Sequence, residues 1–208
     1  MIHTIGLNSL PDSVYVACSG GVDSMALVNF ISMRREVTLL FFHHNTETSE
    51  NAGKFLGDFS NKNNLKLHSE KLSVEKPKKV SPEEFWRIER YKFFDKFKDK
   101  PILMAHHLDD CVETYLMSSF HGCPKLIPHN TGNFYRPFLM TPKKILIDWC
   151  VRKNVPWQED LSNKDNSFAR NRIRNIILPE VKKINPGIDK VIKKKLYNLY
   201  KASNAPIS

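Results

Sequence analysis

The sequence predicts an α/β protein, a doubly wound parallel sheet with a helical, basic C-terminal extension. Short apolar segments alternate with helical segments of ten or more residues, a pattern typical of βαβ units. Glycine, histidine and acidic motifs directly follow the apolar segments, at the strand ends where open parallel sheets bind ligands. From about residue 141 the pattern becomes helical and increasingly basic. We therefore expect residues 1–140 to form the main domain and residues 141–208 to form a helical extension packed on it.

Four segments of the first part have the pattern of strands. The first two are short and apolar, as expected of parallel strands that are buried on both faces. The third alternates apolar and polar residues, and the fourth is a short apolar run. The predicted strands are residues 13–17, 37–43, 65–72 and 101–105.

Helices are predicted after each of these strands. A Gly-Gly turn precedes the first helix, and the second has Leu56 among its apolar positions. Ser81 can cap the third, with Pro82 in its first turn and Glu84 three residues on, a capping-box arrangement. The fourth begins near Asp109. Further helices are predicted at residues 142–153, 168–182 and 188–201. The last is amphipathic, and its apolar side is predicted to consist of Ile188, Val191, Ile192, Leu196 and Leu199.

Charge and cysteine content restrict the functional classes. The formal net charge of +10 over 208 residues favours polyanionic partners such as nucleic acids. No apolar run reaches the roughly 18 to 20 residues of a membrane span, and the first residues lack the pattern of a secretory signal. The four cysteines are widely spaced and form no CxxC, which predicts reduced thiols in a cytosol.

The segment 19–24 (SGGVDS), between a predicted strand and a predicted helix, is the candidate nucleotide-binding loop. Glycines let the backbone turn sharply, and the N–H groups that open the helix point toward an anion. Asp23 would repel that anion unless Mg²⁺ bridges the two. The loop is neither GxxxxGK[ST] nor GxGxxG. The residues expected to bind ATP in this loop are Ser19, Gly20, Gly21, Val22, Asp23 and Ser24.

A second group of polar residues, 106–114 (HHLDDCVET), follows the fourth predicted strand. Asp110 and Glu113 are three residues apart, so they share one face of a helix. Asp109 and Asp110 lie at the helix start, where the helix dipole favours carboxylates. Two histidines and three carboxylates suit a site that binds an amine and a metal, although an acidic helix start with solvated neighbours would have the same pattern.

These motifs together resemble one known family. SGGVDS resembles the loop of the PP-loop ATP pyrophosphatases, whose sheet is Rossmann-like. Within that superfamily, HHLDDCVET resembles the HHxDDxxET signature of the tRNA(Ile)-lysidine synthetases. Five further motifs resemble those of the same family, in the same order, and together they cover roughly residues 13 to 180. They are His43-His44; Glu83 with Arg87, Arg90 and Tyr91; Arg136-Pro137-Phe138-Leu139; Trp157 with Asp160, Ser162 and Asn163; and Arg170-Asn171-Arg172-Ile173-Arg174.

The chain departs from the family pattern in three places. Cys111 stands where the family usually has glutamine, and residues 118–124 (SSFHGCP) replace an arginine-bearing, RGSG-like turn. The sequence also ends at Ser208, whereas bacterial members usually carry C-terminal domains that bind the tRNA. The resemblance is therefore to a minimal form of the family, or to a divergent relative with a changed substrate.

The resemblance implies a reaction and a set of roles. The family adenylates C2 of the wobble cytidine of a CAU-anticodon tRNA(Ile) with ATP and Mg²⁺, and free L-lysine then displaces AMP. It implies that Asp23 engages Mg²⁺, that Asp110 and Glu113 hold the lysine, and that Arg87 faces phosphates. It further implies catalytic roles for Asp23, Asp110, Glu113 and Arg87, ATP contacts from His44 and Arg174, and tRNA contacts from Arg170, Arg172, Lys193, Lys194 and Lys195.

Two alternatives remain open from the sequence. A tRNA thiolase of the same superfamily would use ATP in the same way, although the paired cysteines of disulfide or iron–sulfur thiolases are missing here. A non-catalytic RNA-binding protein on the same scaffold would share the positive charge, although the intact loop and the Asp110/Glu113 pair favour an enzyme.

Overall fold

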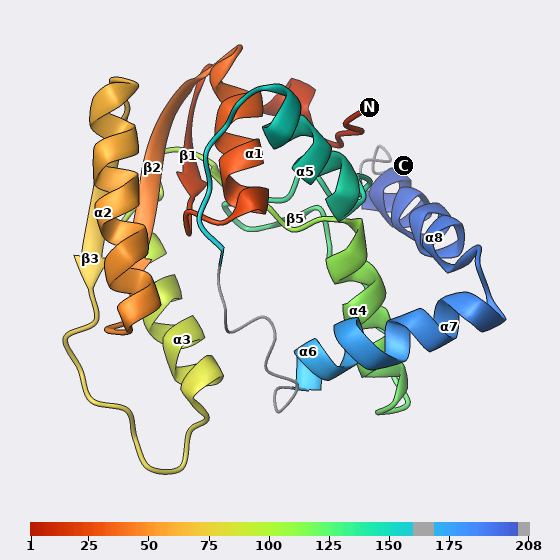
Figure 1. Ribbon diagram of the computed structural model, residues 1–208. Helices are drawn as coiled ribbons and strands as arrows, with labels where there is room; N and C mark the ends of the chain where they lie inside the picture. The colour runs from red at the N-terminus through yellow and green to blue at the C-terminus, as the bar shows by residue number, and fades with distance from the viewer. Residues whose placement is uncertain (160–168, 204–208) are drawn as a thin grey trace.

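The computed structural model describes residues 1–159 and 169–203, and it shows a single mixed sheet flanked by helices (Figure 1). The strands are β1 (Ser13–Ala17), β2 (Glu36–His43), β3 (Lys66–Lys71), β4 (Ile102–Leu103), β5 (Asn130–Thr131) and β6 (Phe134–Tyr135). The helices are α1 (Val22–Ser32), α2 (Glu47–Lys62), α3 (Pro82–Phe94), α4 (Leu108–Ser119), α5 (Lys143–Arg152), α6 (Ala169–Arg172), α7 (Leu178–Ile184) and α8 (Ile188–Ser203).

The order of the strands in the sheet is β3-β2-β1-β4-β6-β5. All neighbouring pairs are parallel except β5–β6. This arrangement confirms the predicted doubly wound α/β sheet, and the four predicted strands appear in their expected places. The β5–β6 hairpin was not predicted, because two residues per strand are too few to give a periodic signal.

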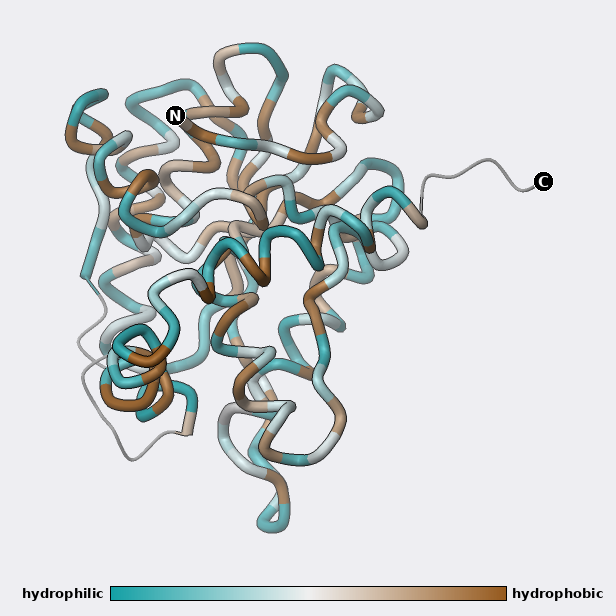
Figure 2. The backbone as a smooth tube through the Cα atoms, turned by 90° about the vertical axis from the view of Figure 1, so that its right-hand side faces the viewer, coloured by the Kyte–Doolittle hydropathy of each residue, from teal (hydrophilic) through white to brown (hydrophobic). Residues whose placement is uncertain are grey.

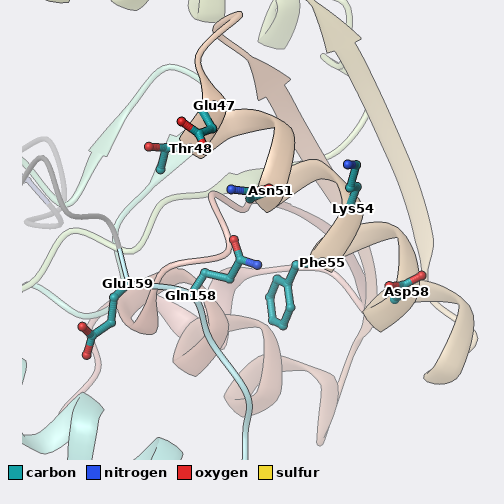
Figure 3. Close-up of a pocket in the computed structure, with 8 residues that line it drawn as sticks. All are labelled: Glu47, Thr48, Asn51, Lys54, Phe55, Asp58, Gln158 and Glu159. Atoms are coloured by element: carbon teal, nitrogen blue, oxygen red, sulfur yellow. The ribbon is translucent and has the colours of Figure 1, made fainter.

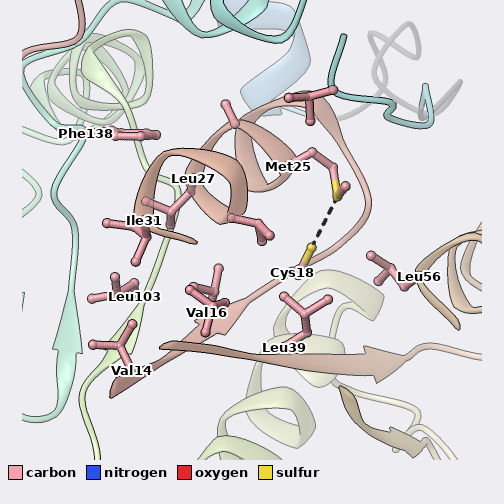
Figure 4. Packing of buried hydrophobic residues seen from close by; sticks show 14 of the residues in the cluster. Val14, Val16, Cys18, Met25, Leu27, Ile31, Leu39, Leu56, Leu103 and Phe138 are labelled. Atoms are coloured by element: carbon pink, nitrogen blue, oxygen red, sulfur yellow. Dashed lines mark hydrogen bonds between the residues drawn. The ribbon is translucent and has the colours of Figure 1, made fainter. Parts of the chain in front are cut away.

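Helices cover both faces of the sheet. Val14 and Val16 of β1 pack with α1, α2 and α5 in one cluster, and Figure 4 shows them beneath Met25 and Leu27 of α1. Tyr15, between them in the strand, packs on the other face in a cluster that includes Phe93 of α3. Successive side chains of a strand point to opposite faces, so β1 contributes to both clusters. It is one of the two central strands of the sheet.

A third apolar cluster joins α4 to the helices near the end of the described chain. Val112 of α4 packs with Leu178 of α7 and with Ile192 and Leu196 of α8. Figure 2 shows hydrophobic and hydrophilic residues alternating along these helices, as expected for amphipathic packing. The prediction for α8 was wrong in one respect, because Val191 and Leu199, counted among its apolar side, are exposed.

The helix predicted over residues 168–182 is divided in the structure. Between α6 and α7 lies a π-helical turn, Ile173–Ile177. Pro179 sits in the first turn of α7 and has no N–H to donate to the preceding turn, which explains the wider π spacing just before it. The helix predicted at residues 142–153 is α5, with Pro142 as its N-cap. Among the described residues, no helix is long and apolar enough to cross a membrane.

Candidate active site

The nucleotide-binding loop lies between β1 and α1, as predicted. Gly20 has φ +81°, a backbone conformation that residues with a side chain rarely adopt. A Cβ there would lie 3.4 Å from the Phe55 ring of α2. The positive φ favours glycine at this position, whereas the spacing alone would allow a Cβ. The backbone N–H of Gln158 donates to the Gly20 carbonyl oxygen (2.9 Å), so a distant segment fixes this side of the loop.

The two loop serines are hydrogen-bonded to the loop itself. The Ser24 hydroxyl is buried; it accepts from the Ser19 N–H (3.3 Å) and donates to the Gly21 carbonyl (2.9 Å). The Ser19 hydroxyl lies 3.4 Å from that of Ser24. Gly21 is the N-cap of α1 without a side-chain cap, so the first N–H groups of α1 remain available to an anion.

Asp23, in the first turn of α1, faces two cationic groups. Its Oδ2 lies 3.3 Å from Lys143 Nζ at the start of α5 and 3.5 Å from His107 Nε2 at the start of α4. Burial raises the pKa of Asp23. The hydrogen bond with His107 and the charges of His107 and Lys143 lower it by more, so that the pKa lies below its ordinary value. Its Oδ1 is buried and has no hydrogen-bond partner. The role of Lys143 was not predicted, because nothing near it in the sequence indicates a partner 120 positions away.

The start of α4 is organised by His107 as well as by the aspartates. His107 is the N-cap of α4. Its ring Nδ1 accepts from the backbone N–H of Asp110 (3.4 Å), and the backbone N–H of His107 donates to Asp110 Oδ2 (2.9 Å). Asp109 accepts from the backbone N–H of Lys143 (2.7 Å) and so joins α4 to α5. Burial lowers the pKa of His107, but the Asp23 hydrogen bond and the charges of Asp110 and Asp23 raise it above its ordinary value.

Glu113, one turn further along α4, is 1% exposed and is bound by two arginines. Arg174 donates through Nε to Oε1 (2.6 Å) and through Nη2 to Oε2 (3.0 Å), and Arg170 Nε donates to Oε2 (3.1 Å). Both guanidinium groups also approach Asp110, at 3.6 and 3.8 Å. We call Asp23, Asp110 and Glu113 with their partners the acidic group; all three carboxylates pair with cations of the chain.

This pairing bears on three predicted roles. Arg170 was expected at the tRNA and Arg174 at ATP phosphates, yet both side chains contact Glu113 and Asp110. The two carboxylates expected to hold a lysine ammonium contact guanidinium groups instead. Arg172, between the two arginines in sequence, is exposed. The partners Asp160, Ser162 and Asn163 of the predicted tryptophan motif lie outside the described residues.

A second group, which we call the basic cluster, lies at the carboxyl ends of β2 and β4. It consists of His44 after β2, His106 after β4, Arg87 and Arg90 of α3, and Arg136 after β6. None of the three arginines forms an ion pair with a carboxylate among the described residues. Buried nitrogen atoms without a hydrogen-bond partner occur in four of the five residues, namely His44 Nδ1, His106 Nδ1, Arg90 Nε and Arg136 Nε.

Rings flank the basic cluster. The Trp86 ring lies 5.6 Å from that of His44, and the Arg87 guanidinium lies 5.7 Å from the centre of the Tyr91 ring. Burial, together with the positive charge of Arg90 and His43, lowers the pKa of His44 to about 4. Burial also lowers the pKa of His106 to about 4, despite the opposing charge of Asp110. Both imidazoles are therefore neutral at pH 7.

The remaining predicted residues lie elsewhere. Lys193, Lys194 and Lys195 are on α8, and Lys195 lies 5.7 Å from the centre of the Tyr115 ring on α4. Sequence reasoning also missed a cleft of about 710 Å³ beside the nucleotide-binding loop (Figure 3). Side chains of α2 and of the segment that bonds Gly20 line it, among them Phe55, Gln158 and Glu159.

Comparison with known proteins agrees with this geometry. Residues 4–181 match the PP-loop domain family. The chain is 32% identical over 192 residues to a tRNA(Ile)-lysidine synthase of Staphylococcus aureus strain MRSA252, covering 82% of this chain and 44% of that protein. It is 34% identical over 201 residues to that of Lactiplantibacillus plantarum, covering 88% and 45%. The chain thus spans less than half the length of these curated relatives.

A solved structure was also matched, that of an NH3-dependent NAD synthetase from Campylobacter jejuni in complex with the nitrate ion. It is 18% identical to the chain, with a TM-score of 0.48, and the match covers 97% of this chain and 90% of that one.

Proposed function

Because the chain belongs to the PP-loop domain family, we propose that it uses ATP to modify a tRNA and that the product is lysidine. The observation that carries this proposal is the position of Asp23. It joins the nucleotide-binding loop to the start of α4, where Asp110 and Glu113 lie. An ATP held by the loop would thus have its phosphates beside the carboxylates that we propose to hold the lysine.

In the first proposed step, the N–H groups at the start of α1 bind the ATP phosphates, and His44 contributes to nucleotide binding. The C2 oxygen of the wobble cytidine attacks the α-phosphorus, the bond to the β-phosphate breaks, and pyrophosphate leaves. A pyrimidine C2 oxygen is a poor leaving group, and adenylation turns it into a good one. Arg87, the exposed arginine of α3, would stabilise the negative charge that develops on phosphate.

The residues present fit a Mg²⁺ ion at this site. The Oδ1 of Asp23 is buried without a hydrogen-bond partner, and Mg²⁺ in nucleotide sites often takes one or two carboxylates with phosphate oxygens and water as its other ligands. No group of three metal-binding side chains occurs in the described part of the chain, which suits a metal that arrives with the nucleotide. When bound, the ion would neutralise charge on the phosphates.

In the second proposed step, the ε-ammonium of free lysine releases a proton to water and the neutral amine attacks C2. A carbon–nitrogen bond forms, the bond between C2 and the adenylated oxygen breaks, and AMP leaves. We propose that Asp110 and Glu113 hold the lysine. Since both carboxylates contact Arg170 and Arg174, the lysine ammonium would have to replace a guanidinium group there. An exchange of one cation for another keeps the buried carboxylates compensated, which avoids the cost of an unpaired buried charge.

We assign nucleotide chemistry to residues 1–140 and propose that residues 141–208 contribute to tRNA binding. The proposed contacts are Arg172, Lys193, Lys194 and Lys195, with Arg170 after release from Glu113. Such lysines and arginines bind phosphates without reading sequence, so the anticodon bases would provide specificity.

The test is a product assay. The protein is incubated with total tRNA, ATP, Mg²⁺ and labelled lysine, and the tRNA is digested to nucleosides. We expect a lysine-labelled pyrimidine nucleoside whose formation requires ATP. ATP-dependent incorporation of sulfur in a parallel reaction, without lysine, would instead identify a thiolase. Binding of tRNA with neither product would indicate a non-catalytic RNA-binding protein.

A further inference from the structure

The basic cluster differs from the acidic group, because no carboxylate among the described side chains pairs with its arginines. Arg90 has no hydrogen bond and no ion pair within the described part of the chain, although it is only partly exposed. Arg136 is 7% exposed and donates to the Pro128 carbonyl (3.1 Å) and to Thr131 (3.2 Å), but not to a carboxylate. A buried guanidinium group that lacks an anion is costly, so this arrangement indicates that an anion comes from outside.

The electrostatic environment points the same way. Burial lowers the pKa of Arg90 and of Arg136 below the ordinary value; Tyr91 opposes this in both, and the neighbouring positive charge of Arg87 adds to it. His44 and His106 are neutral, and each has a buried ring nitrogen without a partner. The cluster therefore combines three positive charges with two neutral imidazoles, a set of groups that matches a phosphate and the polar edge of a base.

Two arginines of the cluster, Arg87 and Arg90, come from the face of the sheet opposite to that of the nucleotide-binding loop. That loop opens α1, and α1 packs on the face of the sheet formed by Val14 and Val16. Arg87 and Arg90 belong to α3, which packs on the opposite face with Tyr15. The start of α4, with Asp110, is near the cluster, because Asp110 affects the pKa of His106. An ATP whose phosphates lie on the loop thus leaves the α3 side open to a second substrate.

From this placement we infer that Arg90 and Arg136 bind a backbone phosphate of the RNA substrate next to the nucleotide that is modified, while Arg87, at the exposed rim, keeps the role on the ATP phosphate proposed above. This inference rests on the proposed function, in that the second substrate is an RNA. Partly exposed rings beside the arginines suit the same ligand, since RNA-binding sites combine arginines with aromatic side chains on which unstacked bases can lie. Trp86 and Tyr91 supply such rings beside the arginines.

The test measures RNA and nucleotide affinity separately in single variants. The RNA probe is a fluorescein-labelled hairpin with a CAU loop, alongside a second hairpin with a scrambled loop, and binding is followed by anisotropy over a range of salt concentrations. The nucleotide probe is the non-hydrolysable α,β-methylene analogue of ATP with Mg²⁺, followed by calorimetry. The variants are Arg90→Gln, Arg90→Lys and Arg136→Gln. The control is Arg34→Gln, which removes the same charge from an exposed position after α1.

We expect Arg90→Gln to raise the dissociation constant of both hairpins about tenfold, because a phosphate contact carries no sequence preference. The slope of log affinity against log salt concentration should fall by about one, because one phosphate contact is lost. Arg90→Lys should retain part of the affinity, and affinity for the ATP analogue should change less than about twofold. Arg34→Gln should leave both affinities near wild type, since a distant exposed charge contributes little to a specific phosphate contact. Melting temperatures of all variants establish that they are folded.

Other outcomes separate the two proposals. Loss of analogue binding with RNA binding intact would assign the cluster to ATP and overturn the inference. Wild-type RNA affinity in both Arg90→Gln and a folded Arg136→Gln would also overturn it, whatever the product assay gives. If Arg90→Gln weakens RNA binding and no lysidine is formed, the inference stands and only the proposed product fails. If the wild-type protein binds neither hairpin, both fail.

Discussion

The acidic group and the basic cluster lie at the same edge of one sheet, yet they differ in whether their charges are paired within the described part of the chain. In the acidic group, Glu113 and Asp110 contact two arginines, and Asp23 contacts Lys143 and His107. In the basic cluster, no arginine contacts a carboxylate within the described part of the chain. Each carboxylate of the acidic group pairs with a cation of the folded chain, and the group joins α1, α4, α5 and α6. The basic cluster is incomplete without a ligand.

The difference shows how paired and unpaired buried charges serve different purposes. A paired set fixes geometry, because removing one member leaves its partner buried without compensation. An unpaired set favours ligand binding. Its buried charges have already lost water, and a ligand that supplies the opposite charge offsets that desolvation free energy. Substitutions in the two groups should therefore have opposite effects on stability and on binding.

The largest effect is expected for Asp23→Asn, which removes the carboxylate with an unpartnered oxygen. If Asp23 holds Mg²⁺ on ATP, pyrophosphate release in the presence of tRNA should fall by about a thousandfold, and RNA affinity should stay within about twofold. Asp12→Asn, at an exposed position away from the site, is the matched control. Full turnover in Asp23→Asn would remove the metal role and would make this carboxylate only a partner of Lys143 and His107.

A direct comparison of the two groups comes from Glu113→Gln and Arg90→Gln. The first variant leaves two guanidinium groups facing a neutral amide, so the free energy of unfolding should fall by about 3 kcal/mol. The second removes an unpaired charge, so stability should be unchanged or slightly higher. Urea denaturation of both variants measures this. Equal destabilisation would show that the two groups do not differ in the way proposed.

The lysines Lys193, Lys194 and Lys195 of α8 offer an intermediate case, since none forms an ion pair with a carboxylate of the described residues and Lys194 and Lys195 are exposed. Replacing Lys193, Lys194 and Lys195 by alanine should raise the RNA dissociation constant about fivefold and flatten its salt dependence. The effect per charge should be smaller than that of Arg90, because exposed charges are screened. Turnover of bound substrate should hardly change. Unchanged RNA affinity at every salt concentration would limit α8 to packing.

The smallest effect is expected in the titration of His44 and His106. Their folded pKa values of about 4 lie below the unfolded value of about 6.5. Between these pH values the unfolded chain binds more protons, so their contribution to stability is present above pH 6.5 and is lost as the pH falls toward 4. An RNA phosphate in the basic cluster should raise both pKa values by about one unit. NMR titration with and without RNA measures the shift.

Local signals in the sequence were sufficient for much of the fold. Ser81 caps α3 as predicted, with its hydroxyl accepting from the Glu84 N–H at 3.2 Å, because capping depends on residues three positions apart. The alternation of strands and helices likewise gave the parallel sheet. The π-helical turn before Pro179 was missed, because proline is common in the first turn of ordinary α-helices and so does not indicate a π-helical turn.

The site was predictable in its components but not in its pairing. The motifs identified Asp110, Glu113 and Arg174 as site residues, but not the contact of Arg174 with Glu113. A salt bridge between residues 61 positions apart depends on how α6 docks on α4, and no local pattern encodes that docking. The bond from Lys143 to Asp23 and the missing partner of Arg90 were hidden for the same reason.

The covering of α1 by α5 has a consequence for the order in which the chain can fold during synthesis. Leu146 and Cys150 of α5 are fully buried against the α1 face, and the Trp149 indole donates to Asn29 of α1 at 3.0 Å. The N–H of Ile5 likewise donates to the Pro137 carbonyl, and that of His3 to the Thr141 hydroxyl. The first helix made by the ribosome thus waits for more than 100 further residues before its apolar face is covered. At about 5 to 20 residues per second, that face stays uncovered for several seconds, an interval in which a chaperone can bind it.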